Sequence, residues 1–148
     1  MSTTHTPPNP RYADAIRAVL TTMPAARSLG FVIASIDAGS VELRQSIRPE
    51  LTEHTGHVQA GILGSLADFA AGASAGTLLP EGWVNVTLDY TIKLVAPVGG
   101  DEVIARGRVV SSGKTVSVAA ADLLDESGRV CATGLATFRN VRIPQDRG

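Results

Sequence analysis

The feature that most constrains the fold of this chain is an apolar stretch at residues 61–79 that contains a single charged side chain. Because apolar residues occupy every side of it, the stretch predicts a helix buried all round, over residues 58–79. Its charge is Asp68, the only one between Glu53 and Glu81. A buried carboxylate needs partners or a shifted pKa, so we expect Asp68 to mark the centre of the chemistry.

A membrane span is the alternative interpretation of such a run, since about 20 apolar residues suffice to cross a bilayer. Here the run contains a carboxylate, serines and four glycines, with no Lys/Arg asymmetry at its flanks. These features favour a buried core helix over a membrane span.

The other segments predict one short helix and six strands. The helix is expected at residues 12–23, and the strands at 31–36, 41–47, 84–94, 102–110, 115–124 and 129–139. Consecutive hairpins make an antiparallel sheet, so the expected fold class is α+β, with the sheet wrapped around the central helix. Because one sheet covers only one face of that helix, we expect a second subunit on the other face.

Length and composition predict one domain at residues 11–142, with a disordered lead at 1–10 and a flexible tail at 143–148. The net charge of −1 offers no electrostatic attraction for nucleic acid. The lead lacks the apolar core of a secretory signal. A single cysteine, Cys131, cannot form an internal disulfide, which favours a reducing compartment, and we expect a cytoplasmic protein.

Two features of the central helix indicate acyl transfer. Residues four apart share a helix face, and on the face of the carboxylate they are Gly64, Asp68, Gly72 and Gly76. The glycines have two compatible interpretations: close packing of the sheet, or a bare floor over which a thin ligand reaches Asp68. At the helix start, the unpaired amides of Ala60 and Gly61 suit a carbonyl oxygen that becomes an oxyanion.

Other chemistries have weaker support. His54 and His57 lie near Glu53, but no metal-binding spacing such as HExxH occurs, and we expect no metal site. Cys131 alternates with small residues in a predicted strand, which indicates packing rather than a nucleophile. Residues 72–76 match the GxSxG pattern of serine hydrolases, but they lie inside the predicted helix, and we expect no nucleophile elbow there.

The segment 56–72, Gly-His-Val-Gln-Ala-Gly-Ile-Leu-Gly-Ser-Leu-Ala-Asp-Phe-Ala-Ala-Gly, resembles the helix signature of hotdog-fold acyl-CoA thioesterases of the phenylacetate-pathway (PaaI-like) type. Segments 89–97, 112–114 and 125–130 look similar too, and the resemblance covers roughly residues 29–140. It implies a hotdog fold and hydrolysis of an acyl- or aryl-acyl-CoA thioester to the free acid and CoA. Coenzyme A is then part of the substrate, and no separate cofactor is expected.

The resemblance also assigns roles residue by residue. Asp68 falls on the family's catalytic carboxylate, a nucleophile or a general base, and Ala60 falls on the glycine whose amide polarises the thioester carbonyl. Two positions depart from the pattern: Gln59 stands where a histidine is usual, and Glu53 where asparagine or glutamine is usual. With the amide of Gly61 beside that of Ala60, these residues form the expected catalytic set. Gly72 falls where some relatives place serine or threonine near the carboxylate, and the expected substrate-binding residues are Gly72, Ser112, Gly113 and Lys114.

The resemblance also implies active sites at a dimer interface, where Asp68 would act with the helix N-terminus of the other subunit. We therefore expect a homodimer or a homotetramer built of dimers. Both aryl-acyl and medium-chain aliphatic thioesters fit a pocket bordered by Leu66, Phe69, Trp83 and Tyr90. Two other functions stay open: a non-catalytic acyl-CoA-binding or regulatory hotdog protein, and a hotdog hydratase. A hydratase needs an Asp/His pair on the helix, and none surrounds Asp68.

Overall fold

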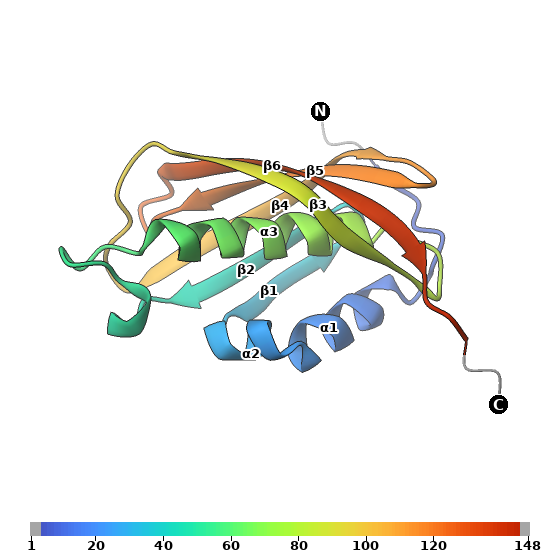
Figure 1. Cartoon of the computed structure of the whole chain (residues 1–148), viewed down its shortest axis with the longest axis horizontal. Helices are drawn as coiled ribbons and strands as arrows, with labels where there is room; N and C mark the ends of the chain where they lie inside the picture. The colour runs from blue at the N-terminus through green and yellow to red at the C-terminus, as the bar shows by residue number, and fades with distance from the viewer. Residues whose placement is uncertain (1–3, 146–148) are drawn as a thin grey trace.

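A six-stranded antiparallel sheet with one long helix against its face dominates the computed structural model, which describes residues 4–145 (Figure 1). The helices are α1 (Tyr12–Thr22), α2 (Pro24–Leu29), the short 3-10 turn η1 (Pro49–Leu51) and α3 (Ala60–Gly76). The strands are β1 (Val32–Asp37), β2 (Ser40–Ser46), β3 (Trp83–Leu94), β4 (Glu102–Ser112), β5 (Val116–Leu124) and β6 (Val130–Arg142). The sheet order is β1-β2-β4-β5-β6-β3, which leaves β1 and β3 at the edges.

The predicted lead and tail fall partly outside the described residues, at 1–3 and 146–148. Within the part of the lead that is described, His5 packs against Gly39 and Asn9 is buried. The predicted α+β architecture, an antiparallel sheet against a long central helix, is confirmed, and the six expected strands all form.

The central helix is shorter at both ends than the apolar run predicts. Val58 and Gln59 are held in extended backbone because their amides donate to the carbonyls of Val98 and Leu51, both at 2.9 Å. The helix therefore begins at Ala60. It ends at Gly76, and the amides of Leu78 and Leu79 turn back to residues only three positions earlier.

Buried polar contacts fix the C-terminal half of α3 to the sheet. The Ser74 hydroxyl donates to the Ala70 carbonyl at 2.7 Å and accepts the amide of Val41 at 3.0 Å. At Gly107 of β4, an added Cβ would lie 2.1 Å from the Ala70 carbonyl oxygen. Only glycine lets β4 approach this closely, so the position of α3 over the sheet is tightly determined.

The helix α2 is absent from the sequence prediction, which placed no element between the helix at 12–23 and the strand at 31–36. Proline is well tolerated at the first position of a helix, and Pro24 occupies that position in α2. At the other end, Gly30 adopts φ 76°, and the Arg48 guanidinium donates to the carbonyls of Leu29 (2.6 Å) and Ser28 (3.2 Å). These bonds supply donors for the last carbonyls of a short helix.

An irregularity in β3 breaks the strict alternation that its sequence shows. The pairing of β3 with β6 shifts register between Thr87 and Asp89. Before the shift, Asn85 and Thr87 point at α3 and hydrogen-bond to it; after the shift, Tyr90 contacts α3 at Gly64. A β-bulge reverses which residues face the core, so two polar side chains of β3 enter the interior.

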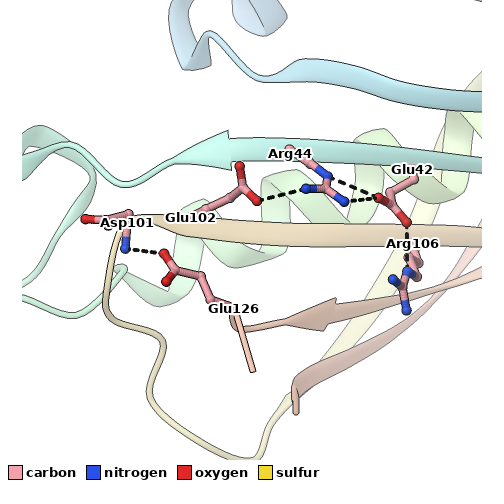
Figure 2. A network of polar contacts seen from close by, with 6 residues as sticks. All are labelled: Glu42, Arg44, Asp101, Glu102, Arg106 and Glu126. Atoms are coloured by element: carbon pink, nitrogen blue, oxygen red, sulfur yellow. Dashed lines mark hydrogen bonds and ion pairs between the residues drawn. The ribbon is translucent and has the colours of Figure 1, made fainter. Parts of the chain in front are cut away.

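The sheet face opposite α3 carries a network of charges, drawn in Figure 2. Arg44 and Arg106 both reach Glu42, at 3.2 and 2.8 Å, and Arg44 also reaches Glu102 at 3.4 Å. Exposed ion pairs of this kind contribute little to stability individually. In the described part of the chain, no helix is long and apolar enough to cross a membrane.

Candidate active site

Asp68 lies midway along α3, on the side of the helix that faces β3. Its side chain is partly buried, and one hydrogen bond holds it: the Thr87 hydroxyl donates to Asp68 Oδ1 at 2.9 Å. The second oxygen, Oδ2, accepts no hydrogen bond from residues 4–145. One carboxylate oxygen is thus fixed in place while the other is available to a water molecule or a substrate.

The surroundings of Asp68 disfavour its charged form. Burial raises the pKa of its carboxyl above the ordinary value of 3.8, and the hydrogen bond from Thr87 opposes that increase. Shifts of this kind cluster at catalytic carboxyl groups, because a basic carboxylate accepts a proton more readily.

A cavity of about 260 Å³ runs along α3 from Asp68 and is lined by α1, α3, β3, the segment between α3 and β3, and Phe138 of β6. Its walls are mostly apolar and include the predicted border residues Phe69 and Trp83, together with Leu20 of α1. The other two predicted border residues do not line it: Leu66 is fully buried, and Tyr90 covers Gly64 instead.

The glycine stripe is covered by neighbouring side chains. An added Cβ at Gly64 would lie 3.4 Å from the Tyr90 ring, and one at Gly72 would lie 3.2 Å from the Phe138 ring. At Gly76 an added Cβ would lie 2.7 Å from Ile16 Cδ1. Close packing therefore accounts for all three glycines, while Gly72 and Gly76 also line the cavity that leads to Asp68.

At the start of α3, the side chain of Gln59 caps the helix. Its Oε1 accepts the amides of Gly61 at 2.6 Å and Ile62 at 3.2 Å. The predicted donor Gly61 is therefore already paired. The amide of Ala60 makes no hydrogen bond within residues 4–145, and Ala60 is exposed. Of the two predicted donors, Ala60 is the one available to a carbonyl oxygen.

Glu53 organises the loop before α3. Its carboxylate accepts the Thr55 hydroxyl at 2.5 Å and the amides of Thr55 and His57, at 3.1 and 3.0 Å. These hydrogen bonds, the Thr55 hydroxyl first, hold the pKa of Glu53 below its ordinary value. The Thr55 oxygen also lies 2.8 Å from His57 Nδ1. Because the Thr55 hydroxyl donates its proton to Glu53, His57 Nδ1 is the donor in this contact.

Glu53, His57 and Ala60 line a second, more open cleft of about 460 Å³, which does not include Asp68. Ala60 and Asp68 are eight residues apart on one helix, or about 12 Å along its axis. A single thioester carbonyl cannot contact both groups within one chain. Within one chain, Glu53, His57 and Ala60 therefore lie together at the second cleft. Asp68 and Thr87 lie together at the first cavity.

The hairpin residues Ser112, Gly113 and Lys114 are exposed and join β4 to β5. Gly113 forms the tight turn, because its amide donates to Val116 O at 2.9 Å and an added Cβ would lie 2.6 Å from the same oxygen. Neither cavity includes these residues. Within residues 4–145, no three His, Cys, Asp or Glu residues are grouped as metal ligands. Cys131 is fully buried in β6.

Two site residues escaped the sequence analysis: Thr87, which holds Asp68, and Asn85, whose Nδ2 donates to the Gly72 carbonyl at 2.9 Å. Both belong to the polar half of the alternation in residues 84–94. No glycine or proline marks the bulge that turns them inward. The only available signal was a polar stripe on a strand expected to pack against the helix that carries Asp68.

Comparison with known proteins agrees with this architecture. A family model described as the thioesterase superfamily matches residues 55–132. A solved thioesterase family protein from Silicibacter pomeroyi is 30% identical, with 88% of this chain and 98% of that chain covered and a TM-score of 0.85.

Two more distant structures share the fold. The E. coli PaaI protein of the phenylacetic acid degradation operon is 22% identical, with a TM-score of 0.81 over 90% of this chain and 97% of that one. A thioesterase from Haemophilus influenzae is 19% identical, with a TM-score of 0.81 over 99% and 97%. The chain belongs to the thioesterase superfamily, and it is a hotdog-fold thioester hydrolase.

Proposed function

We propose that this protein hydrolyses acyl-CoA thioesters to the free acid and CoA, with Asp68 as the group that attacks the carbonyl carbon or activates water. The observation that carries the proposal is the geometry of Asp68. It is a partly buried carboxylate of raised pKa, held through one oxygen by Thr87, at the end of an apolar cavity of about 260 Å³. An acyl chain lying in that cavity presents its thioester to the carboxylate.

Two routes use the same atoms. As general base, Asp68 takes a proton from water, whose oxygen adds to the carbonyl carbon, and the C–S bond then breaks to release the CoA thiolate. As nucleophile, Asp68 forms the bond to carbon itself and displaces the thiolate, and water then hydrolyses the anhydride. In both routes the carbonyl oxygen becomes negative and needs a donor, for which the amide of Ala60 is free.

The separation of Ala60 from Asp68 supports a site shared between two copies of this chain. About 12 Å along α3 is too far for one carbonyl group to contact both. In a homodimer, the cleft at the α3 N-terminus of one subunit would face the Asp68 cavity of the other. The strand β3 is a long edge strand whose outer side is unpaired in the single chain, and it offers backbone groups for such an association.

The catalytic proposal is tested by release of free thiol from a panel of acyl-CoAs, including hexanoyl-, decanoyl- and phenylacetyl-CoA. We expect turnover of at least one thioester and its loss in Asp68→Asn. Saturable binding of every thioester without turnover would instead support a non-catalytic acyl-CoA-binding protein.

The shared site is tested by mixing two inactive variants, Asp68→Asn and Ala60→Pro. Proline suits the first helical position and removes only an unpaired amide, and Gln59 already has the extended backbone that a following proline requires (φ −66°, ψ 141°). If the site is shared, each mixed dimer contains one intact site, and random mixing restores about a quarter of the wild-type rate. A mixture that stays inactive while mixed dimers form would contradict the shared site.

A further inference from the structure

The cavity beside Asp68 contains a polar group that the hydrolysis does not use. Asn85 of β3 lines the cavity, and its amide lies across α3 beside Gly72 and Gly76. Asn85 Nδ2 donates to the Gly72 carbonyl at 2.9 Å. This bond determines the orientation of the amide, because a flipped amide would place two carbonyl oxygens against each other.

The fixed orientation leaves Asn85 Oδ1 as an acceptor with no donor among residues 4–145, and because Oδ1 is not among the fully buried unpaired atoms, it is accessible to a ligand. Oδ1 lies 3.9 Å from the position that a Cβ on residue 72 would take, so this oxygen is next to Gly72, and both residues line the cavity. An acceptor without a partner in an apolar cavity is expected to receive a hydrogen bond from whatever fills that cavity.

The position of Asn85 relative to Asp68 follows from the strand. Asn85 precedes Thr87 by two residues on the same face of β3, and Thr87 contacts Asp68. Two strand residues span about 6.6 Å. Along β3, the free acceptor therefore lies roughly 7 Å from the position of Thr87 and Asp68, on the side toward Gly72 and Gly76.

The length of the cavity and the charges that line it restrict which acyl groups can bind. Its lining follows α3 from Asp68 to Leu79, about 16 Å at 1.5 Å per residue, and follows α1 from Ala15 to Met23 alongside. That length accommodates an extended aliphatic chain of about ten carbons, which spans about 13 Å at about 1.3 Å per carbon. No Lys, Arg or His lines the cavity within the described residues, so it provides no partner for a charged chain end.

We propose that Asn85 is a specificity-determining residue that selects a neutral, medium-chain acyl group bearing a hydroxyl about 7 Å from the thioester carbonyl, the hydroxyl donating to Asn85 Oδ1. This proposal rests on the acyl-CoA function proposed above and names its substrate class. A hydroxyl is required because a keto oxygen or an ether offers no proton to this acceptor.

The test compares matched pairs of thioesters: 6-hydroxydecanoyl-CoA with decanoyl-CoA, and 4-hydroxyphenylacetyl-CoA with phenylacetyl-CoA. We expect wild-type kcat/KM to favour the hydroxylated decanoyl thioester about tenfold, the effect of one neutral hydrogen bond. Asn85→Leu, nearly isosteric and without an acceptor, should abolish the preference. The control Val19→Ala, in the α1 wall of the same cavity, should alter both rates of a pair and keep their ratio.

The results separate this inference from the proposed hydrolysis. If no thioester is hydrolysed, the catalytic proposal fails, and the same pairs compared by calorimetric Kd still test Asn85. The role of Asn85 would be overturned if the two decanoyl thioesters had equal kcat/KM, or equal Kd, in the wild type. It would also be overturned if Asn85→Leu kept the preference for the hydroxylated thioester. A hydroxyl preference confined to the aryl pair would overturn the aliphatic assignment. Asn85→Val replaces the leucine variant if that variant does not fold.

Discussion

Two carboxylates close to α3 have opposite environments. Asp68 sits on the helix with a single hydrogen bond, and burial raises its pKa. Glu53 sits in the loop before the helix, where a hydroxyl and two amides donate to it and lower its pKa. A carboxylate surrounded by donors is a poor base that holds a loop in shape. A partly buried carboxylate with few donors has a raised pKa and is the better base.

The largest expected effect is loss of hydrolysis in Asp68→Asn. Asparagine keeps the size of the side chain and can still accept the Thr87 hydroxyl, but it neither attacks nor takes a proton. General-base help contributes about 10²–10⁴-fold, and we expect kcat/KM to fall within that range. The matched change Glu53→Gln should lower activity far less. Equal losses in the two variants would remove the functional distinction between the carboxylates.

The same substitution should stabilise the fold at neutral pH. Because the pKa of Asp68 is raised on folding, the folded state binds the proton more tightly than the unfolded chain. Stability from this group is complete below the unfolded value, near 3.8, and declines as the pH rises through the folded pKa. Asp68→Asn should therefore have the higher Tm at pH 7 and no advantage below about pH 3.8. An Asn variant that is less stable at pH 7 would indicate a structural role for the charge.

Removal of the Thr87 hydroxyl should make Asp68 more basic and less well placed. The hydrogen bond from Thr87 lowers the pKa of Asp68, so in Thr87→Val the acid limb of the pH–rate profile should move to higher pH. A hydrogen bond to a charged group is worth about 1.5–3 kcal/mol, and we expect kcat to fall about tenfold or more. Thr91→Val, on the same strand but exposed, is the control and should leave the profile in place.

Glu53→Asn tests whether the two carboxylates meet across subunits. Within one chain, Glu53 is not among the causes of the raised pKa of Asp68. In a shared site, Glu53 of a second copy lies close to Asp68, and like charges disfavour joint ionisation. We then expect the acid limb to move to lower pH in Glu53→Asn. An unchanged limb would mean that Glu53 only organises its own loop.

The smallest effects are expected at Gln59. Loss of its cap in Gln59→Ala should lower the free energy of unfolding by about 1 kcal/mol, whereas Gln59→Asn should retain most of the stability. Gln59→His restores the residue usual in the family, and activity should be kept or increased. Chemical denaturation and thiol release measure the two effects. Loss of activity in a stable Gln59→His would show that the site depends on the amide.

Several features followed from local sequence alone. The apolar run around Asp68 predicted the central helix, and the alternating strands with their turns predicted the antiparallel sheet. The hotdog resemblance came from the residues of segment 56–72. These signals are local because helix and strand periodicity and turn chemistry act over neighbouring residues. The short helix α2 was missed because Pro24 both ends one helix and begins the next.

Only the tertiary structure decided which polar groups face Asp68. A register shift in β3, unmarked by glycine or proline, turns Thr87 and Asn85 toward the helix. Tertiary structure also decided which amide at the start of α3 is available. The Gln59 side chain accepts the amide of Gly61, and the amide of Ala60 has no partner among residues 4–145. Sequence periodicity determines which residues share a face, but the direction of that face depends on packing between segments far apart in the chain.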